Sequence, residues 1–127
     1  MITLKEVEEI HKTLIDSFGG SHGIRDFAAL DSALARPFQT FDGKELLPAP
    51  IQKVAALIES ILINNPLIDG NKRTGYVLMR LLLISYNLDL NASQTEKYDF
   101  VISIATGQQN FEAIIAWLNK HVVKNSA

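Results

Sequence analysis

Apolar residues recur every three or four positions along most of this chain of 127 residues. That spacing places apolar side chains on one side of an α-helix, whereas a half-buried strand alternates apolar and polar residues. No long alternating run is present. The pattern therefore predicts an all-α protein, a compact bundle of about six helices. The length suits one hydrophobic core and is short for two, so we expect a single domain over residues 1–127.

Capping signals set the expected limits of the first two helices. Thr3 and Glu6 form a capping box, in which each side chain accepts a hydrogen bond from a backbone N–H at the helix start. The Gly-Gly pair at 19–20 ends this helix, because glycine adopts the left-handed conformation without strain. Asp26 is a suitable N-cap for a second helix, which ends before Pro37.

The later helices are separated by loops rich in Gly, Pro and Asn. Residues 39–50 contain an Asp-Gly turn signal and two prolines, and we expect a loop with at most a short extended piece at 39–41. Pro50 suits the first turn of a third helix. A fourth helix over about 70–86 is apolar around most of its circumference, so we expect it to be central. N-cap signals for two further helices are Ser93 with Glu96, and Asn110.

Composition excludes several classes of function. The formal net charge is −2, which provides no basic excess for nucleic-acid binding, so we expect no direct nucleic-acid partner. Cysteine is absent, which excludes disulfides and thiol catalysis. The longest apolar stretches carry Glu59 and Arg80 and are too short to span a bilayer. The N-terminus lacks a signal-peptide pattern. We therefore expect a cytoplasmic protein that does not contact a membrane.

Residues 65–74 have the composition of a phosphate site. A run of Asp, Gly, Asn, Lys and Arg at 69–73 follows a Pro-containing turn and precedes the apolar fourth helix. The first N–H groups of a helix lack intrahelical partners, and the helix dipole is positive there, so phosphate binds readily. Gly70 would let a phosphate approach the backbone closely. The amide of Asn71 could orient either the loop or a nucleotide.

The charged side chains of this segment complete the set. Lys72 and Arg73 supply cations that bind phosphate oxygens. Asp69 would repel phosphate, but one carboxylate together with phosphate oxygens is a usual way to hold Mg²⁺. Phosphoryl or nucleotidyl transfer needs these groups. An ordinary polar turn before a solvated helix start has a similar composition, so the loop alone leaves both interpretations open.

The segment resembles the signature of the Fic/Doc family, in particular its death-on-curing toxin branch. That motif runs His, any residue, Phe, any residue, Asp, Gly or Ala, Asn, Lys, Arg, Thr. Residues 69–74 match it consecutively, while Asn65 falls on the His and Leu67 on the Phe. Lys72 after Asn71 favours the toxin branch over the adenylyltransferase branch, which usually has glycine there. The resemblance extends to segments 19–20, 23–26, 33–37, 39–41 and 106–107 and to the final helix with Trp117.

The resemblance implies a fold and an activity. The fold would be the compact all-α Fic core. Family members use ATP with Mg²⁺ to modify a hydroxyl on a target protein. Members of the toxin branch are similar to kinases of elongation factor Tu and pair with a small antitoxin protein. This chain shows no inhibitory helix with a Ser-x-x-x-Glu pattern, so inhibition would come from a partner.

The resemblance also implies roles for individual residues. Asp69 would hold the metal. The phosphate and nucleotide cradle would consist of Gly70, Asn71, Lys72 and Arg73. The flap that aligns the target segment would be Gln39, Thr40 and Phe41. The catalytic positions would be Asn65, Asp69 and Arg73.

Asn65 departs from the family pattern at the catalytic base. A histidine there accepts the proton of the target hydroxyl, and an asparagine amide has no basic nitrogen. Loss of a general base costs about 10²- to 10⁴-fold in rate. Phosphoryl transfer through a loose transition state depends less on a base, so residual activity is possible. Whether the chain is an enzyme therefore remains an open question at this point.

Other side chains could contribute to the site. His22 lies in the Gly-rich loop and is the flexible candidate for a substitute base, whereas His11 and His121 are more typical of helix faces. Arg25 and Arg36 could reach the site or simply be solvated.

Three hypotheses follow. The first is a death-on-curing-type toxin, a phosphotransferase weakened by Asn65 that acts on a translation protein resembling elongation factor Tu. The second is an inactive pseudoenzyme that binds a nucleotide or a regulatory protein. The third, a structural helical domain with a coincidental loop, is disfavoured because the resemblance covers the whole chain. The sequence does not identify the target, the antitoxin, the transferred group or the oligomeric state.

Overall fold

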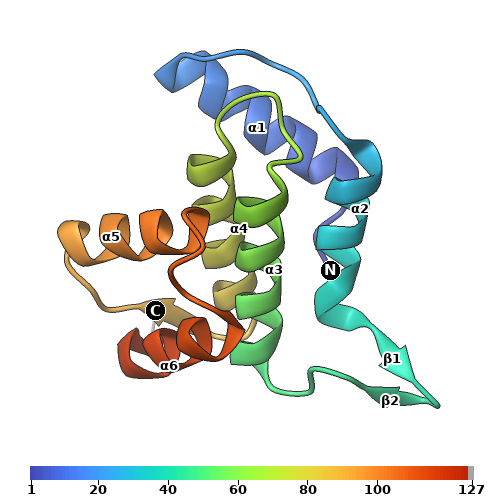
Figure 1. The fold of residues 1–127 in the computed structure, drawn as a ribbon, viewed down its shortest axis with the longest axis vertical. Coiled ribbons are helices and arrows are strands. Elements are labelled where there is room, and N and C mark those ends of the chain that lie inside the picture. Colours follow the sequence, from blue (N-terminus) through green and yellow to red (C-terminus); the bar gives the residue numbers. More distant parts are fainter. Residues whose placement is uncertain (126–127) are drawn as a thin grey trace.

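The computed structural model describes residues 1–125, which form an all-α bundle with two small two-stranded sheets (Figure 1). The expected domain limit at residue 127 lies outside the described residues. The helices are α1 (Leu4–Phe18), α2 (Phe27–Ala35), a 3₁₀ turn η1 (Arg36–Phe38), α3 (Pro50–Asn64), α4 (Asn71–Ser85), α5 (Gln94–Ala105) and α6 (Phe111–His121). The strands are β1 (Thr40–Phe41), β2 (Lys44–Glu45), β3 (Leu88–Leu90) and β4 (Val122–Lys124).

The predicted helix starts are confirmed at the level of single capping residues. Thr3 and Glu6 form the expected capping box at α1, and Ser93 with Glu96 forms the one at α5. The Asp26 carboxylate accepts from Ala29 N–H at 2.9 Å and begins α2. The amide oxygen of Asn110 caps α6 in the same way. These caps are local contacts, so sequence spacing alone was enough to place them.

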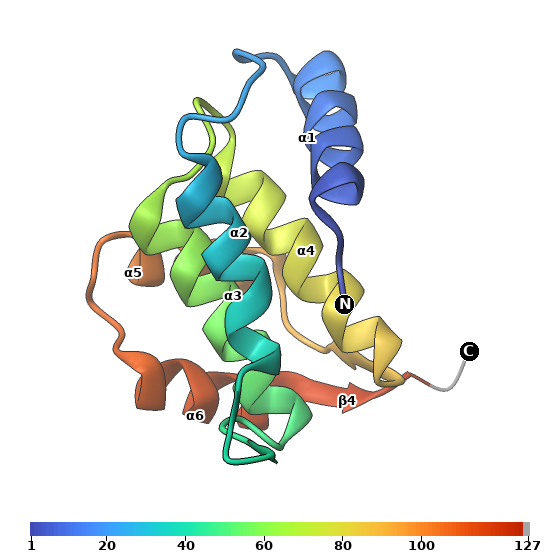
Figure 2. The same cartoon turned by 90° about the vertical axis from the view of Figure 1, so that its right-hand side faces the viewer.

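α3 and α4 form the centre of the bundle and lie antiparallel (Figures 1 and 2). α1 and α2 cover one side of this pair, and α5 and α6 pack on the other. α3 is the more enclosed of the two, because α2, α4, α5 and α6 all contact it. α4 keeps an exposed edge at Leu81 and Ile84. The loop that joins the two helices contains the 65–74 segment, so the core fixes both ends of that loop.

The strands were largely missed by the sequence analysis. β1 pairs with β2 as a hairpin, and β3 pairs antiparallel with β4, so that Leu90 lies opposite Val122. Each strand has only two or three residues. Such strands are too short to show alternation, and the partners β3 and β4 are separated by two helices. Only the expected extended piece at 39–41 overlaps one of them.

Within residues 1–125, no helix has both the length and the apolar character needed to cross a membrane.

A bidentate ion pair ties α4 to the strand that follows it. Arg80 donates from Nε and Nη2 to the two carboxylate oxygens of Asp89, at 3.0 and 2.7 Å. Hydrogen bonding from Arg80 holds the pKa of Asp89 below its ordinary value, against the opposing effect of burial. Because the folded-state pKa is depressed, the pair stabilises the fold above the unfolded-state pKa and is lost as the pH falls.

We predict that Asp89→Asn destabilises the protein at neutral pH by about 0.5–1 kcal/mol, in the range of partly exposed pairs. The difference from wild type should shrink as the pH falls below about 4, because the unfolded chain takes up a proton on Asp89 before the folded protein does. Urea unfolding at pH 7 and at pH 3 measures this. An equal difference at both pH values would show that the charge of Asp89 contributes nothing.

A candidate phosphate site at the start of α4

The loop between α3 and α4 begins and ends on left-handed residues. Asn65 caps α3 with φ 47° and ψ 59°, and Gly70 precedes α4 with φ 74° and ψ 23°. Glycine adopts this conformation freely, and asparagine is among the few other residues that do so at low cost. The identity of Asn65 therefore has a backbone reason as well as any chemical one.

The side chain of Asn71 closes this loop. Its Oδ1 accepts from Leu67 N–H at 2.9 Å, and its Nδ2 donates to the Leu67 carbonyl at 3.0 Å. Leu67 is 1% exposed and packs in the core. Of the two roles expected for Asn71, the structure thus shows the orientation of the loop. Its Oδ1 and Nδ2 atoms each make one hydrogen bond to the loop, and Nδ2 keeps a second N–H.

The connection between α1 and α2 lies directly against the motif loop (Figures 1 and 2). Ile68 N–H donates to the Gly23 carbonyl at 3.1 Å, and Ile24 pairs with Leu67 in an isolated antiparallel bridge. The backbone N–H groups of Arg25 and Asp26 both donate to the Pro66 carbonyl. The candidate site therefore consists of two loops that are far apart in the sequence and hydrogen-bonded to each other.

Arg25 adds a side-chain link between the two loops. Its Nε donates to the Asn65 carbonyl at 2.8 Å and its Nη2 to the Asn64 carbonyl at 2.6 Å. These carbonyls belong to the last turn of α3, where intrahelical partners run out. Arg36, the other open candidate, contacts Glu59 at 2.9 Å in the body of α3 and does not line the motif cavity. Arg25 does not line the cavity either, but of the two arginines it is the one that contacts the motif loop.

The Asp69 carboxylate is held in place by two backbone amides. Oδ1 accepts from Gly70 N–H at 2.8 Å, and Oδ2 accepts from Ser21 N–H at 3.1 Å. A Cβ atom at Gly20 would lie only 2.7 Å from Oδ2, so this approach requires a glycine. Each carboxylate oxygen has a second lone pair, and the residue is exposed. Asp69 can therefore accept a further ligand without losing these contacts.

A shallow cavity of about 340 Å³ opens over the N-terminus of α4. It is lined by Asn65 and residues 68–73. Lys72 is exposed, and Arg73 places its guanidinium 4.2 Å from the centre of the Phe18 ring at the end of α1. The structure therefore brings Asn65, Asp69, Gly70, Lys72 and Arg73 to one cavity.

A second cavity continues from the first between α4 and α5. Its volume is about 390 Å³, and Lys72 and Arg73 line both cavities. Its walls are mostly apolar, with the rings of Tyr76 and Tyr98 and a third cation, Lys97.

A model of the Fic/DOC family matches residues 1–83, which include both loops of the site. The chain belongs to the Fic/Doc family. It is 34% identical over 106 residues to Toxin Doc of Mycolicibacterium smegmatis, and the alignment covers 80% of each chain. Six helices in a mostly helical structure are typical of the Fic fold. The protein is therefore a Doc toxin homologue of this family.

None of the three histidines of this Doc homologue lines the motif cavity. The Nε2 atom of His22 lies 2.9 Å from the Asp16 carboxylate, on the α1 side of the loop. His121 contacts Glu96 and the Trp117 carbonyl, at the junction of α5 and α6. His11 lies behind the motif loop, with its Nε2 atom 2.8 Å from the Asp69 carbonyl oxygen. In this conformation, no imidazole reaches the motif cavity.

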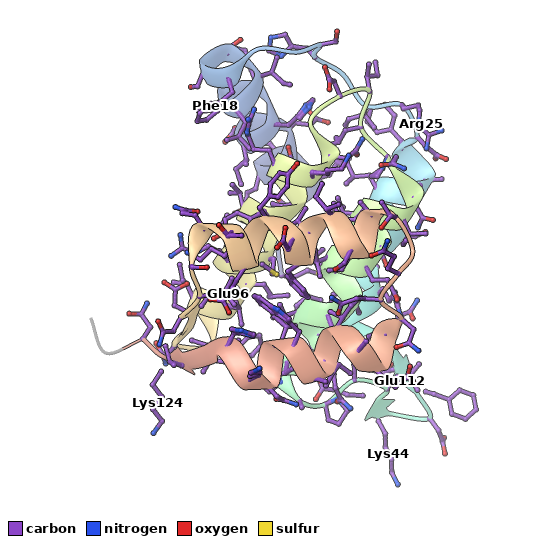
Figure 3. The ribbon with its side chains drawn as sticks, turned by 60° about the vertical axis from the view of Figure 1, so that its left-hand side comes forward. Phe18, Arg25, Lys44, Glu96, Glu112 and Lys124 are labelled. Atoms are coloured by element: carbon purple, nitrogen blue, oxygen red, sulfur yellow. The ribbon has the colours of Figure 1, made fainter. Side chains whose placement is uncertain are left out.

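The expected flap is not brought to the motif. Gln39 precedes the β1–β2 hairpin, and Thr40 and Phe41 form its first strand. The hairpin comes before α3, whereas the motif follows the end of α3. A helix of 15 residues is about 22 Å long, so the two lie at opposite ends of it. Figure 3 shows Lys44 of the hairpin and Arg25 of the site at opposite ends of the molecule. The loop over 19–26 contacts the motif instead.

The hairpin is anchored at its base by a buried lysine. Lys53 of α3 is 4% exposed, and its ammonium donates to the Glu45 carboxylate at 2.7 Å and to the Pro37 carbonyl at 3.3 Å. These contacts hold both ends of the hairpin away from the motif.

Sequence reasoning missed two contacts of Asp69. Ser21 N–H donates to its carboxylate, and the His11 ring contacts its backbone carbonyl. The two contacts join residues 48 and 58 positions apart, and no local spacing rule reports such pairs. The one signal was the Gly-rich composition of the loop over 19–23, which indicates close approach to another backbone.

We predict that Asn71→Asp destabilises the motif loop, although an acidic residue ordinarily favours a helix N-terminus. The replacement loses the N–H donor and turns a carboxylate oxygen toward the Leu67 carbonyl, so the cost should be about 1–3 kcal/mol. Chemical denaturation measures it. Asn64→Asp, an exposed change at the end of α3, is the control. An equal effect of both substitutions would contradict the role of Asn71.

Proposed function

We propose that this Doc homologue is a toxin of a toxin–antitoxin pair that binds ATP with Mg²⁺ at the start of α4. It would transfer a phosphoryl group to a hydroxyl on a translation protein resembling elongation factor Tu, at a rate reduced by Asn65. The observation that supports this best is the single cavity shared by the Asp69 carboxylate, the first turn of α4, Lys72 and Arg73.

The residues present fit Mg²⁺ carried by a nucleotide. Asp69 offers hard oxygen atoms with unused lone pairs, at a position fixed by two amides. Among residues 1–125, no three His, Cys, Asp or Glu side chains are grouped to hold a metal ion alone. Mg²⁺ usually binds through one or two carboxylates, phosphate oxygens and water, so this donor set suits it. When bound, the metal would neutralise charge on the phosphates.

The chain itself would position the nucleotide. The unpaired N–H groups in the first turn of α4 would bind phosphate oxygens. Lys72 would add a cation without losing a partner, since its side chain makes no hydrogen bond or ion pair within residues 1–125. Arg73 would have to leave the Phe18 ring, or extend over it, to reach the phosphate. The groove between α4 and α5 offers aromatic and apolar walls for the base.

An antitoxin partner is part of the same proposal. Apolar side chains are exposed around the site: Phe18 at 64%, Phe27 at 57% and Ile68 at 56%. Large exposed apolar residues that gather near a polar site favour a protein interface. A partner that covered them would also restrict access to the motif cavity.

The alternative is a pseudoenzyme that binds nucleotide or a regulatory protein without turnover. The observation that favours it is that no histidine lines the motif cavity. Binding and turnover are therefore tested separately.

For binding, we predict that Mg²⁺ with ATP binds the wild-type protein in calorimetric titration. Asp69→Ala should lose the Mg²⁺-dependent part of the binding free energy, because the only carboxylate in the cavity is removed. Asp31→Ala, an exposed carboxylate change on α2, should bind as wild type does. No binding by the wild-type protein would refute the nucleotide site.

For turnover, we predict that Asn65→His accelerates transfer from labelled ATP to target protein by about 10²- to 10⁴-fold, the usual contribution of a general base. Histidine also tolerates the left-handed conformation observed at this position. Asn64→His, one residue earlier, is the matched control and should have no such effect.

The outcomes separate the hypotheses. Similar rates for the wild type and Asn65→His would contradict the claim that Asn65 weakens the enzyme. Binding of ATP without transfer by either protein would favour the pseudoenzyme.

A further inference from the structure

A buried histidine outside the sequence motif contacts the backbone of Asp69. His11 lies on α1 with only 4% of its surface exposed. Its Nε2 atom is 2.8 Å from the carbonyl oxygen of Asp69, a residue 58 positions away. A carbonyl oxygen only accepts hydrogen bonds, so Nε2 carries the proton and donates it. The imidazole thus connects α1 to the residue proposed to hold Mg²⁺.

The same ring packs under the turn in which α4 begins. A Cβ atom at Gly70 would lie 3.7 Å from His11 Nε2 and 3.3 Å from the Ile15 side chain. His11 and Ile15 are both buried, one helical turn apart on α1. They form the floor on which the turn at 69–70 rests, on the side opposite the motif cavity.

Three contacts from separate segments then fix Asp69. The Gly70 amide and the Ser21 amide hold its carboxylate oxygens, and His11 holds its carbonyl. Of the three donors, His11 is the only side chain and the only donor that is buried. Of the other two donors, Ser21 is exposed and Gly70 is half-buried. Without His11, the peptide that follows Asp69 would be free to rotate and carry the carboxylate away from both amides.

We propose that His11 is a positioning residue that sets the Asp69 carboxylate in the orientation required to hold Mg²⁺. This inference rests on the proposed function, because it deepens the role given there to Asp69. His11 does not contact the nucleotide and does not act as a base, since it lies behind the motif loop. Groups that orient metal ligands typically contribute about 10- to 100-fold to metal affinity.

The chain contains a matched control for this role. His121 is also buried, at 9% exposed, and one of its ring nitrogens contacts a backbone carbonyl, that of Trp117, at 2.8 Å. It lies at the junction of α5 and α6, away from both loops of the site. Replacement of His121 should lower the stability of the fold without changing the position of the Asp69 carboxylate.

The test compares His11→Leu, His11→Gln and His121→Leu with the wild-type protein. One measurement is the Mg²⁺ concentration that half-saturates ATP binding. The other, made without metal or nucleotide, is hydrogen exchange at the Ser21 and Gly70 amides, which donate to the Asp69 carboxylate. Exchange therefore reports the position of the carboxylate directly.

We expect His11→Leu to raise the required Mg²⁺ by about tenfold or more and to accelerate exchange at both amides. His11→Gln keeps an N–H donor, so it should recover part of both effects. His121→Leu should lower the melting temperature and leave both readouts at their wild-type values. If His11→Leu does not fold, His11→Met replaces it as the variant without a donor.

Each remaining outcome counts against one claim. Wild-type exchange and Mg²⁺ dependence in His11→Leu would overturn the positioning role, while loss of Mg²⁺ dependence in Asp69→Ala would still support the proposed function. Equal effects of His11→Leu and His121→Leu would also overturn it, because they would reflect general destabilisation. If no variant binds Mg²⁺ with ATP, the proposed function fails, and exchange alone decides whether His11 fixes the carboxylate.

Discussion

The pair of hydrogen bonds between the Asn71 side chain and the Leu67 backbone is the constraint on which the candidate site depends. It closes the loop between α3 and α4 on itself. The burial of Leu67 then fixes the closed loop to the core. An amide carries a donor and an acceptor on neighbouring atoms, so the Asn71 side chain can bind both the N–H and the carbonyl of one residue. The first residues of α4 thereby line one cavity.

The site is assembled from two loops and two helices, α1 and α4. The loop over 19–26 pairs with the motif loop through backbone hydrogen bonds, and Arg25 links it to the last carbonyls of α3. α1 contributes His11, whose ring contacts the backbone carbonyl of Asp69. Because the central helices hold the ends of the motif loop, and the second loop and α1 restrain its middle, the Asp69 carboxylate has a defined position before any ligand binds. Such preorganisation is what electrostatic catalysis of phosphoryl transfer requires.

The sequence was sufficient to place the helix starts, because capping residues such as Thr3 and Asp26 act within one turn. It also displays the chemical groups of the motif, because these are consecutive residues. It was insufficient for contacts across the fold. The sequence suggested His11 as a helix-face residue, yet its ring is buried against Asp69. The expected flap at 39–41 lies beyond the far end of α3, because a helix of that length intervenes. These positions depend on tertiary packing, which periodicity does not encode.

The central claim is that Asp69 and the start of α4 hold a metal-bound nucleotide. The most direct measurement adds Mn²⁺ with ATP to the isotopically labelled protein and records which amide resonances the paramagnetic ion broadens. The account predicts strong broadening at Asp69, Gly70 and Ser21, and its loss in Asp69→Ala. Broadening centred elsewhere, or the same pattern in Asp69→Ala, would contradict it.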